Sequence, residues 1–174
     1  MNRTDYIVGI DPDTEKSGVA LLDTKEIRLE LQTLTFPELV DRIIYLRDKS
    51  RFEGKTICAV VEAGWKNSKS NFHGYYGRRG EKIAKNVGAN HETGKKLIEL
   101  LVHWGIPVAE MAPLPLRIDG VNMWSGPSGK ITHEEFLAVT GYKASRTNQE
   151  ERDAALLAWR LAGHPLRINK RKTH

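Results

Sequence analysis

The first part of the chain alternates short apolar runs with turn residues, which is typical of neighbouring β-strands. Residues 6–10 form a continuous apolar run that ends at Asp11. Two further runs follow at residues 17–22 and 27–33. The last of them alternates, with one face formed by Ile27, Leu29, Leu31 and Thr33. Together the three runs predict a meander of three strands.

Two more strands are predicted further along, each preceded by a helix. A helix is expected from Phe36 through Lys49, with Pro37 in its first turn. The continuous β-branched and apolar run at residues 56–61 predicts a central strand buried on both faces. A second helix is expected over residues 92–104, with an earlier start left open, and residues 106–111 form the fifth predicted strand.

The last third of the chain is expected to hold two helices after an irregular stretch at residues 112–129. Capping boxes start both helices: Thr132 with Glu135, and Asn148 with Glu151. Gly163 ends the last helix. The order β-β-β-α-β-α-β-α-α predicts an α/β fold, a mixed five-stranded sheet with helices on its faces.

Length and composition indicate one soluble domain. The 174 residues suit a single core, which we assign to residues 1–166, with a basic tail at residues 167–174. No apolar run is long enough to span a bilayer, and the first residues lack a signal-peptide core, so a cytoplasmic location is expected. Cys58 is the single cysteine, which excludes an internal disulfide and argues against a thiolate zinc cluster.

Positive charge is concentrated in two places, although the net charge is only +5. The tail carries four basic residues and no acid, and a second basic stretch runs over residues 66–85. Separated positive charge suits a polyanion such as nucleic acid, because each neutralised phosphate releases counterions. A solvated face and a frayed tail explain the same charges, so charge alone leaves both interpretations open.

Acidic residues stand at positions that favour a shared site. Asp11 ends the first strand and Glu62 ends the most apolar strand, and open α/β sheets bind ligands at strand ends. Glu150 and Asp153 are three apart, so they share one face of the last helix. Structural alternatives exist for each: Asp11 could start a turn, Glu62 could pair with Lys66, and Glu150 could interact with the helix dipole.

Carboxylates that meet in one place repel one another and raise their own pKa values. Divalent cations relieve that repulsion, and oxygen ligands without cysteine favour magnesium or manganese. Two such ions about 4 Å apart can activate water and stabilise the leaving oxygen in a phosphoryl displacement. The acidic residues are therefore consistent with metal-dependent cleavage of a phosphodiester.

Three ordered motifs resemble those of RuvC-type Holliday junction resolvases. The first motif is Ile7-Val8-Gly9-Ile10-Asp11-Pro12, followed by Ser17-Gly18-Val19-Ala20. The second motif is Val60-Val61-Glu62, and the third is the acidic segment at residues 150–158. The resemblance covers nearly the whole chain. It implies a ribonuclease H-like fold and a homodimer with two magnesium ions, for which manganese can substitute.

By matching position, the resemblance assigns the metal ligands and catalytic acids to Asp11, Glu62, Glu150 and Asp153. It also implies basic residues near the scissile phosphate, for which Lys130 is the best match and Arg117 a looser one. A solvated lysine before a helix is the alternative for Lys130. The chain departs from the family at Asp13, where glycine is common, and at Glu150, where aspartate is usual.

The segment after Glu62 is richer in aromatic residues and glycine than the family pattern. Aromatic rings offer faces on which unpaired bases stack, and arginine side chains can hold phosphates. The expected nucleic-acid contacts are Trp65, Lys66, Phe72, Tyr75, Tyr76, Arg78, Arg79 and Arg117. A loop that packs on its own domain or on a dimer partner is the alternative.

The sequence therefore predicts a magnesium-dependent, structure-selective DNA endonuclease that resolves four-way junctions. The opening motif also resembles bacterial nucleases that process ribosomal RNA precursors, and a junction-binding protein without catalysis is a further alternative. Sugar kinases and actin-like ATPases share a similar first strand. They need a second full domain around the nucleotide, for which 174 residues are too few.

Overall fold

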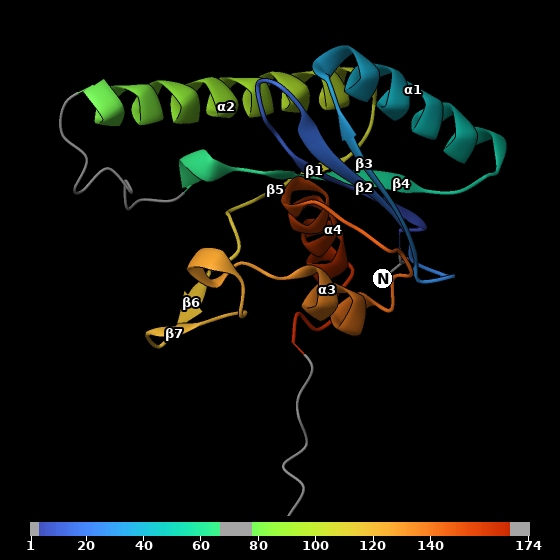
Figure 1. The fold of residues 1–174 in the computed structure, drawn as a ribbon. Coiled ribbons are helices and arrows are strands. Elements are labelled where there is room, and N and C mark those ends of the chain that lie inside the picture. The colour runs from blue at the N-terminus through green and yellow to red at the C-terminus, as the bar shows by residue number, and fades with distance from the viewer. Residues whose placement is uncertain (1–3, 67–77, 168–174) are drawn as a thin grey trace, which may run out of the picture.

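The computed structural model describes residues 4–66 and 78–167, which form a mixed five-stranded sheet with helices on both faces (Figure 1). The strands lie in the order β3-β2-β1-β4-β5. Their bounds are Tyr6–Asp11 for β1, Ser17–Asp23 for β2, Arg28–Leu34 for β3, Ile57–Glu62 for β4 and Val108–Met111 for β5. The expected α/β fold with a mixed sheet is confirmed, and β1 to β3 form the predicted meander.

Strand direction brings two of the acidic residues to one edge of the sheet. β1 pairs in parallel with β4, and the register aligns Ile10 with Val61. Asp11 and Glu62 are the next residues of the two strands, so their carboxylates leave the sheet side by side. β5 is parallel to β4 on its other side, with Glu62 aligned with Met111.

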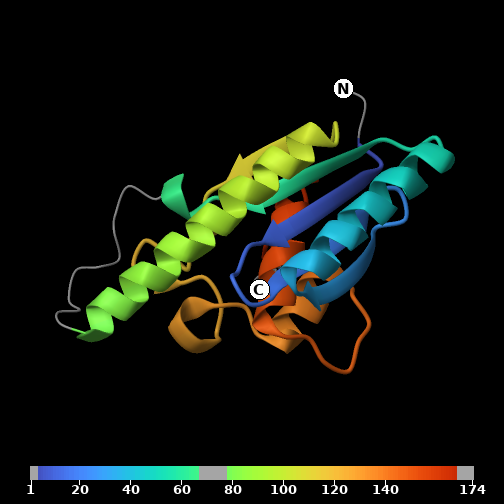
Figure 2. The same ribbon diagram turned by 90° about the horizontal axis from the view of Figure 1, so that it is seen from above.

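Two helices cover each face of the sheet. α1 (Phe36–Phe52) and α2 (Arg78–His103) lie on one face, and α3 (His133–Thr140) and α4 (Gln149–Leu161) lie on the other (Figures 1 and 2). Each pair encloses its own apolar core. The core under α1 and α2 includes Ile10, Leu39, Ile43, Leu97 and Leu101. The core around α4 includes Val60, Phe136, Leu156, Leu157 and Trp159.

α4 packs unusually close to the sheet, because two glycines in the strands leave room for its backbone. A Cβ atom on Gly9 would lie 2.0 Å from the carbonyl oxygen of Ala154, and one on Gly18 would lie 2.0 Å from that of Glu150. No other residue type fits at these positions without moving the helix. The two glycines therefore place the start of α4 directly over the end of β1.

The capping boxes predicted for α3 and α4 are present. Thr132 and Glu135 exchange hydrogen bonds at the start of α3, and Asn148 and Glu151 do so at the start of α4. Glu151 therefore has the structural role that its spacing predicted. Its neighbour Glu150 is left exposed in the first turn of α4.

Two local predictions were wrong, and the start of the second helix, which was left open, is now fixed. Ile27 precedes β3 rather than belonging to it, with φ 51° and half of its side chain exposed, because the chain turns there. The second helix starts earlier than residue 92, since α2 begins at Arg78. Residues 112–129 are not wholly irregular, since they contain a hairpin of β6 (Arg117–Ile118) and β7 (Val121–Asn122), and Pro127–Gly129 forms a 3₁₀ turn.

The described helices include none long and apolar enough to cross a membrane. The predicted basic tail falls largely at residues 168–174, outside the described residues. The domain boundary at residue 166 stays a prediction.

Candidate active site

A cavity of about 260 Å³ opens where β1 and β4 end, and the four predicted acids all line it. Asp11 and Glu62 come from the strand ends, while Glu150 and Asp153 come from the first turns of α4. The other lining residues are Pro12, Asp13, Asn90, Pro113, Leu114, Leu116, Trp124, Lys130 and Leu156. The structure therefore brings the four acids to one cavity, which the sequence alone did not show, and each acid belongs to an element fixed by the core.

Burial and mutual repulsion disfavour negative charge in this cavity. Burial, with the charges of Glu62 and Asp153, raises the pKa of Asp11 to about 8. Burial and the charge of Asp153 raise the pKa of Glu62 to about 7. In both cases the nearby ammonium of Lys130 works in the opposite direction. The cavity therefore holds more negative charge than its own groups neutralise.

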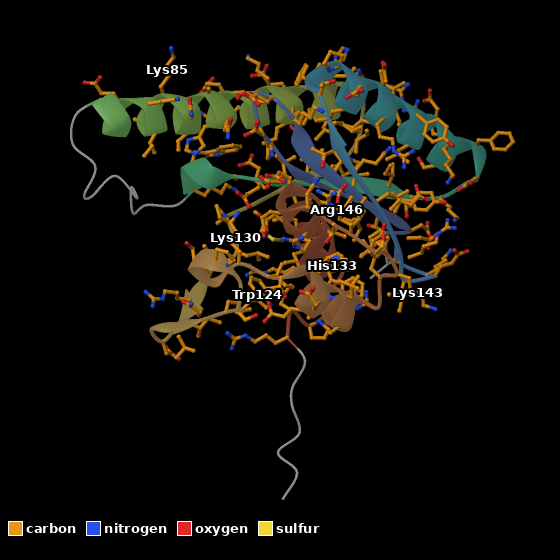
Figure 3. The ribbon with its side chains drawn as sticks, in the orientation of Figure 1. Lys85, Trp124, Lys130, His133, Lys143 and Arg146 are labelled. Atoms are coloured by element: carbon orange, nitrogen blue, oxygen red, sulfur yellow. The ribbon has the colours of Figure 1, made fainter. Side chains whose placement is uncertain are left out.

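Lys130 is the one basic side chain among the described residues that line the cavity. Its Nζ donates to Asp153 Oδ2 at 2.9 Å, and it lies beside α4 below the sheet (Figure 3). Burial disfavours the ammonium, but the charge of Asp153 and this hydrogen bond outweigh burial and raise the pKa of Lys130. The lysine is thus a partly buried counterion rather than the solvated side chain that the sequence left open.

The other oxygen of Asp153 is also engaged. Gln149 Nε2 donates to Asp153 Oδ1 at 2.6 Å, and Arg152 Nη2 donates to Gln149 Oε1 at 2.9 Å. Arg152 also donates to the backbone carbonyls of Ile131 and Thr147, at 3.2 and 2.7 Å. Ile131 follows Lys130 directly, so one arginine holds both the segment that carries the lysine and the glutamine that orients Asp153.

α2 contributes an amide to the same cavity. Asn90 Nδ2 donates to Asp13 Oδ2 at 3.0 Å, and Asn90 Oδ1 accepts from the backbone of Thr14. The other oxygen of Asp13 accepts from the backbone of Glu15 at 2.8 Å. Asp13, the extra carboxylate noted in the sequence, is therefore engaged in holding the β1–β2 turn and in joining it to α2.

A second cavity, of about 190 Å³, also borders Asp11 and Glu62. Trp65 and His91 line it, and their rings meet edge to face with centroids 5.8 Å apart. A Cβ atom on Gly94 would lie 2.9 Å from the Trp65 ring, so the tryptophan is packed on α2. Trp65 is half-buried here, and His91 borders the site.

Two of the remaining predicted nucleic-acid contacts, Lys66 and Arg117, have described side chains. Lys66 is exposed, and its Nζ forms an ion pair with Glu110 Oε2 at 3.1 Å. The pairing of Lys66 with Glu62, considered as a structural alternative, is therefore not the one that the structure shows. Arg117 is exposed on β6 and donates to Asn122 at 3.0 Å. The other expected contacts lie outside the residues or side chains that the structure describes, so they stay predictions: Phe72, Tyr75, Tyr76, Arg78 and Arg79.

Two solved structures similar to this chain are both RuvC, the family that the motifs resemble. Thermus thermophilus RuvC in complex with a Holliday junction substrate matches with a TM-score of 0.49 and 16% identity, over 88% of this chain and 90% of that one. The Thermus thermophilus RuvC structure matches with a TM-score of 0.44 and 16% identity, over 91% and 97%. No protein-family model and no curated protein sequence matches the chain.

The donor chemistry of the cavity suits a hard divalent cation, since its acidic groups are all oxygen donors and carry surplus negative charge. The arrangement is not yet a closed ligand shell. Within residues 4–66 and 78–167, no three Asp, Glu, His or Cys side chains are placed so that they could already hold a metal ion. Lys130 instead bonds to one of the acids.

Sequence reasoning missed several residues at this site. Gln149 and Asn90 carry no charge and belong to no motif, and Trp124 fell in a stretch expected to be irregular. One signal was available for Gln149: it lies four residues before Asp153, so the two side chains share a helix face.

Proposed function

We propose that this protein is a divalent-metal-dependent endonuclease that cuts branched DNA, with the four-way junction as its substrate. The observation that carries the proposal is the meeting of Asp11, Glu62, Glu150 and Asp153 in one cavity beside Lys130. They come from β1, β4 and α4, and glycines in the strands let α4 lie close enough for them to meet. A structural role for these acids would not require them to share a cavity and repel one another.

Asp11, Glu62, Glu150 and Asp153 would hold magnesium, with manganese as a substitute. Bound there, the metal would lower the pKa of a water molecule and neutralise charge on the scissile phosphate. The raised pKa values of Asp11 and Glu62 mean that both acids gain from a cation nearby. For Asp153 to bind the metal through Oδ2, this oxygen must give up the hydrogen bond that it accepts from Lys130 Nζ.

Lys130 has a second role once it is released from Asp153. Its ammonium lies at the cavity and stays charged at neutral pH, because its pKa is raised. It is positioned to stabilise the negative charge that builds on the phosphate oxygens. Oxygen from water bonds to phosphorus as the bond from phosphorus to the 3′ oxygen breaks, which leaves a 5′ phosphate and a 3′ hydroxyl. The water loses a proton and the 3′ oxygen gains one.

The test is cleavage of a labelled synthetic four-way junction with magnesium, beside linear duplex and RNA–DNA hybrid of equal length. We expect paired nicks in the junction, none with a chelator present, and none from Asp11→Asn. Cutting of hybrid or RNA alone would instead identify an RNA-processing nuclease. Junction binding without cleavage would identify a catalytically silent junction binder. Paired nicks also need two sites, so sedimentation of the complex tests the proposed homodimer.

A further inference from the structure

The β6–β7 hairpin projects from the molecule (Figure 1), and residues that flank it line the active-site cavity. Two aliphatic side chains, Ile118 and Val121, form a cross-strand pair at its tip. They are 43% and 66% exposed, and neither belongs to either of the two apolar cores. Asp119 and Gly120 form the turn between them, both with the positive φ that a two-residue hairpin turn requires.

Hydrogen bonds and close packing hold the base of this hairpin. Met123 donates its backbone N–H to the carbonyl oxygen of Leu116 at 2.7 Å, and Arg117 donates to Asn122 at 3.0 Å. Gly129 packs against the hairpin so tightly that a Cβ atom there would lie 2.5 Å from the Leu116 carbonyl oxygen. The tip is therefore presented on a fixed stem rather than on a loose loop.

The stem is continuous with the cavity. Leu116, just before β6, and Trp124, just after β7, both line the cavity that holds the four acids. Trp124 is buried and its indole N–H donates to the carbonyl of Leu166 at 3.4 Å. A polymer whose phosphate lies at the acids would therefore continue past the stem toward the tip.

Charge around the hairpin suits nucleic acid more than an apolar protein partner. Arg117 is exposed on β6, and Arg167 donates to the backbone carbonyls of Asn122 and Met123 at 3.3 and 3.0 Å. Both guanidinium groups therefore lie at β7, and arginine side chains are common phosphate contacts in protein–DNA complexes. Asp119 opposes this charge at the turn, which makes it a useful probe of whether the tip meets DNA.

We propose that Ile118 and Val121 form an apolar wedge that enters the branch point of the DNA and separates stacked bases there. Aliphatic side chains inserted between base steps unstack them, and the cost is least where bases are already imperfectly stacked, as at a branch. The wedge would thus select branched over linear DNA. This inference rests on the proposed nuclease function, which it supplies with a means of choosing its substrate.

The experiment uses a four-way junction carrying 2-aminopurine, whose fluorescence rises on unstacking, at the branch point. The full chain carries Asp11→Asn in every sample so that no strand is cut. We expect fluorescence to rise severalfold on binding. Adding Ile118→Ser with Val121→Ser is expected to remove more than half of that rise, while Val102→Ser, which changes a valine 62% exposed on α2, leaves it intact.

The outcomes separate the wedge from the proposed function. If the serine variant binds the junction and gives the full fluorescence rise, the wedge is refuted while the nuclease proposal stands. If no variant binds the junction at all, the proposed function fails and the wedge fails with it. If the serine substitutions instead change the mass of the free protein in sedimentation, the tip contacts a second copy of the chain, and the DNA assignment is overturned.

Asp119→Asn gives a second test that does not depend on removing apolar contacts. Asparagine tolerates the positive φ of the turn, so the hairpin keeps its shape while it loses one negative charge. A tip that enters DNA should then bind the junction at least twofold more tightly at low salt, with a smaller gain at high salt. Unchanged affinity at low salt would mean that the tip stays away from the DNA.

Discussion

Replacing Asp11 by asparagine is expected to stabilise the metal-free protein while it removes the proposed nuclease activity. The carboxyl group is half-buried at the end of β1, and burial with the charges of Glu62 and Asp153 raises its pKa to about 8. In the unfolded chain the same group has its ordinary pKa of 3.8. Folding at neutral pH must therefore either protonate this group or bury its charge. An asparagine amide has neither cost.

The size of the effect follows from linkage between protonation and folding. A group whose pKa is higher in the folded state favours folding at low pH, and that contribution is lost as pH rises from 3.8 toward about 8. At pH 7 the penalty is about 4 kcal/mol, at about 1.4 kcal/mol for each pH unit above the unfolded pKa. Burying the amide costs about 1–2 kcal/mol. We therefore expect Asp11→Asn to raise the free energy of unfolding by about 2–3 kcal/mol at pH 7. At pH 5 the charge penalty is under about 2 kcal/mol, which the cost of burying the amide offsets, so almost no gain is expected.

The assay is urea unfolding followed by tryptophan fluorescence, at pH 5 and pH 7 with a chelator present. Asp41→Asn, which changes an exposed carboxylate on α1, is the matched control and should alter stability by less than about 0.5 kcal/mol. Magnesium should then stabilise the wild-type protein by mass action, and Asp11→Asn far less. Equal stability of wild type and Asp11→Asn at pH 7, or a gain as large at pH 5, would refute the reasoning.

Three further substitutions test the packing and the polar contacts of the site. Gly18→Ala should lower the free energy of unfolding by at least about 2 kcal/mol and abolish cleavage, because its Cβ would lie 2.0 Å from the α4 backbone. Gly88→Ala is the control: a Cβ atom there would meet no atom within 4 Å, so the substitution should be neutral or slightly stabilising. Lys130→Met should bind magnesium more tightly in calorimetry yet cleave at least tenfold more slowly, and weaker binding would contradict competition for Asp153. Gln149→Leu should weaken magnesium binding severalfold, whereas unchanged affinity would show that Asp153 needs no positioning.

The sheet was predictable because its strands are strongly patterned, and the acids because they stand where those strands end. The start of α2 was not. Its second half packs on the sheet through Leu97 and Leu101, which gave the helical spacing. Its first half faces the site through Val87, Asn90 and His91, a mixed set without a hydrophobic period. Because this half of α2 faces the site with polar as well as apolar residues, the spacing of apolar residues does not predict where the helix begins.

The acids of the site were predictable by motif, but their supporting contacts were not. The spacing to Asp153 is the one signal that the sequence offers for Gln149, and its role also depends on Arg152, which donates to both Gln149 and the Ile131 carbonyl. The β6–β7 hairpin was missed because its strands are two residues long, too short for alternation to show. Its one signal was the pair Asp119-Gly120, which is typical of a tight hairpin turn.

The glycines of the first two strands tie the site to the core. Gly9 and Gly18 admit the backbone of α4, and the same helix buries Leu156 and Leu157 against the sheet. The free energy gained by that apolar burial is what holds Glu150 and Asp153 against the repulsion of the strand-end acids. The core therefore offsets the electrostatic cost of the site. For this reason, changes that loosen α4 should remove activity before they unfold the chain.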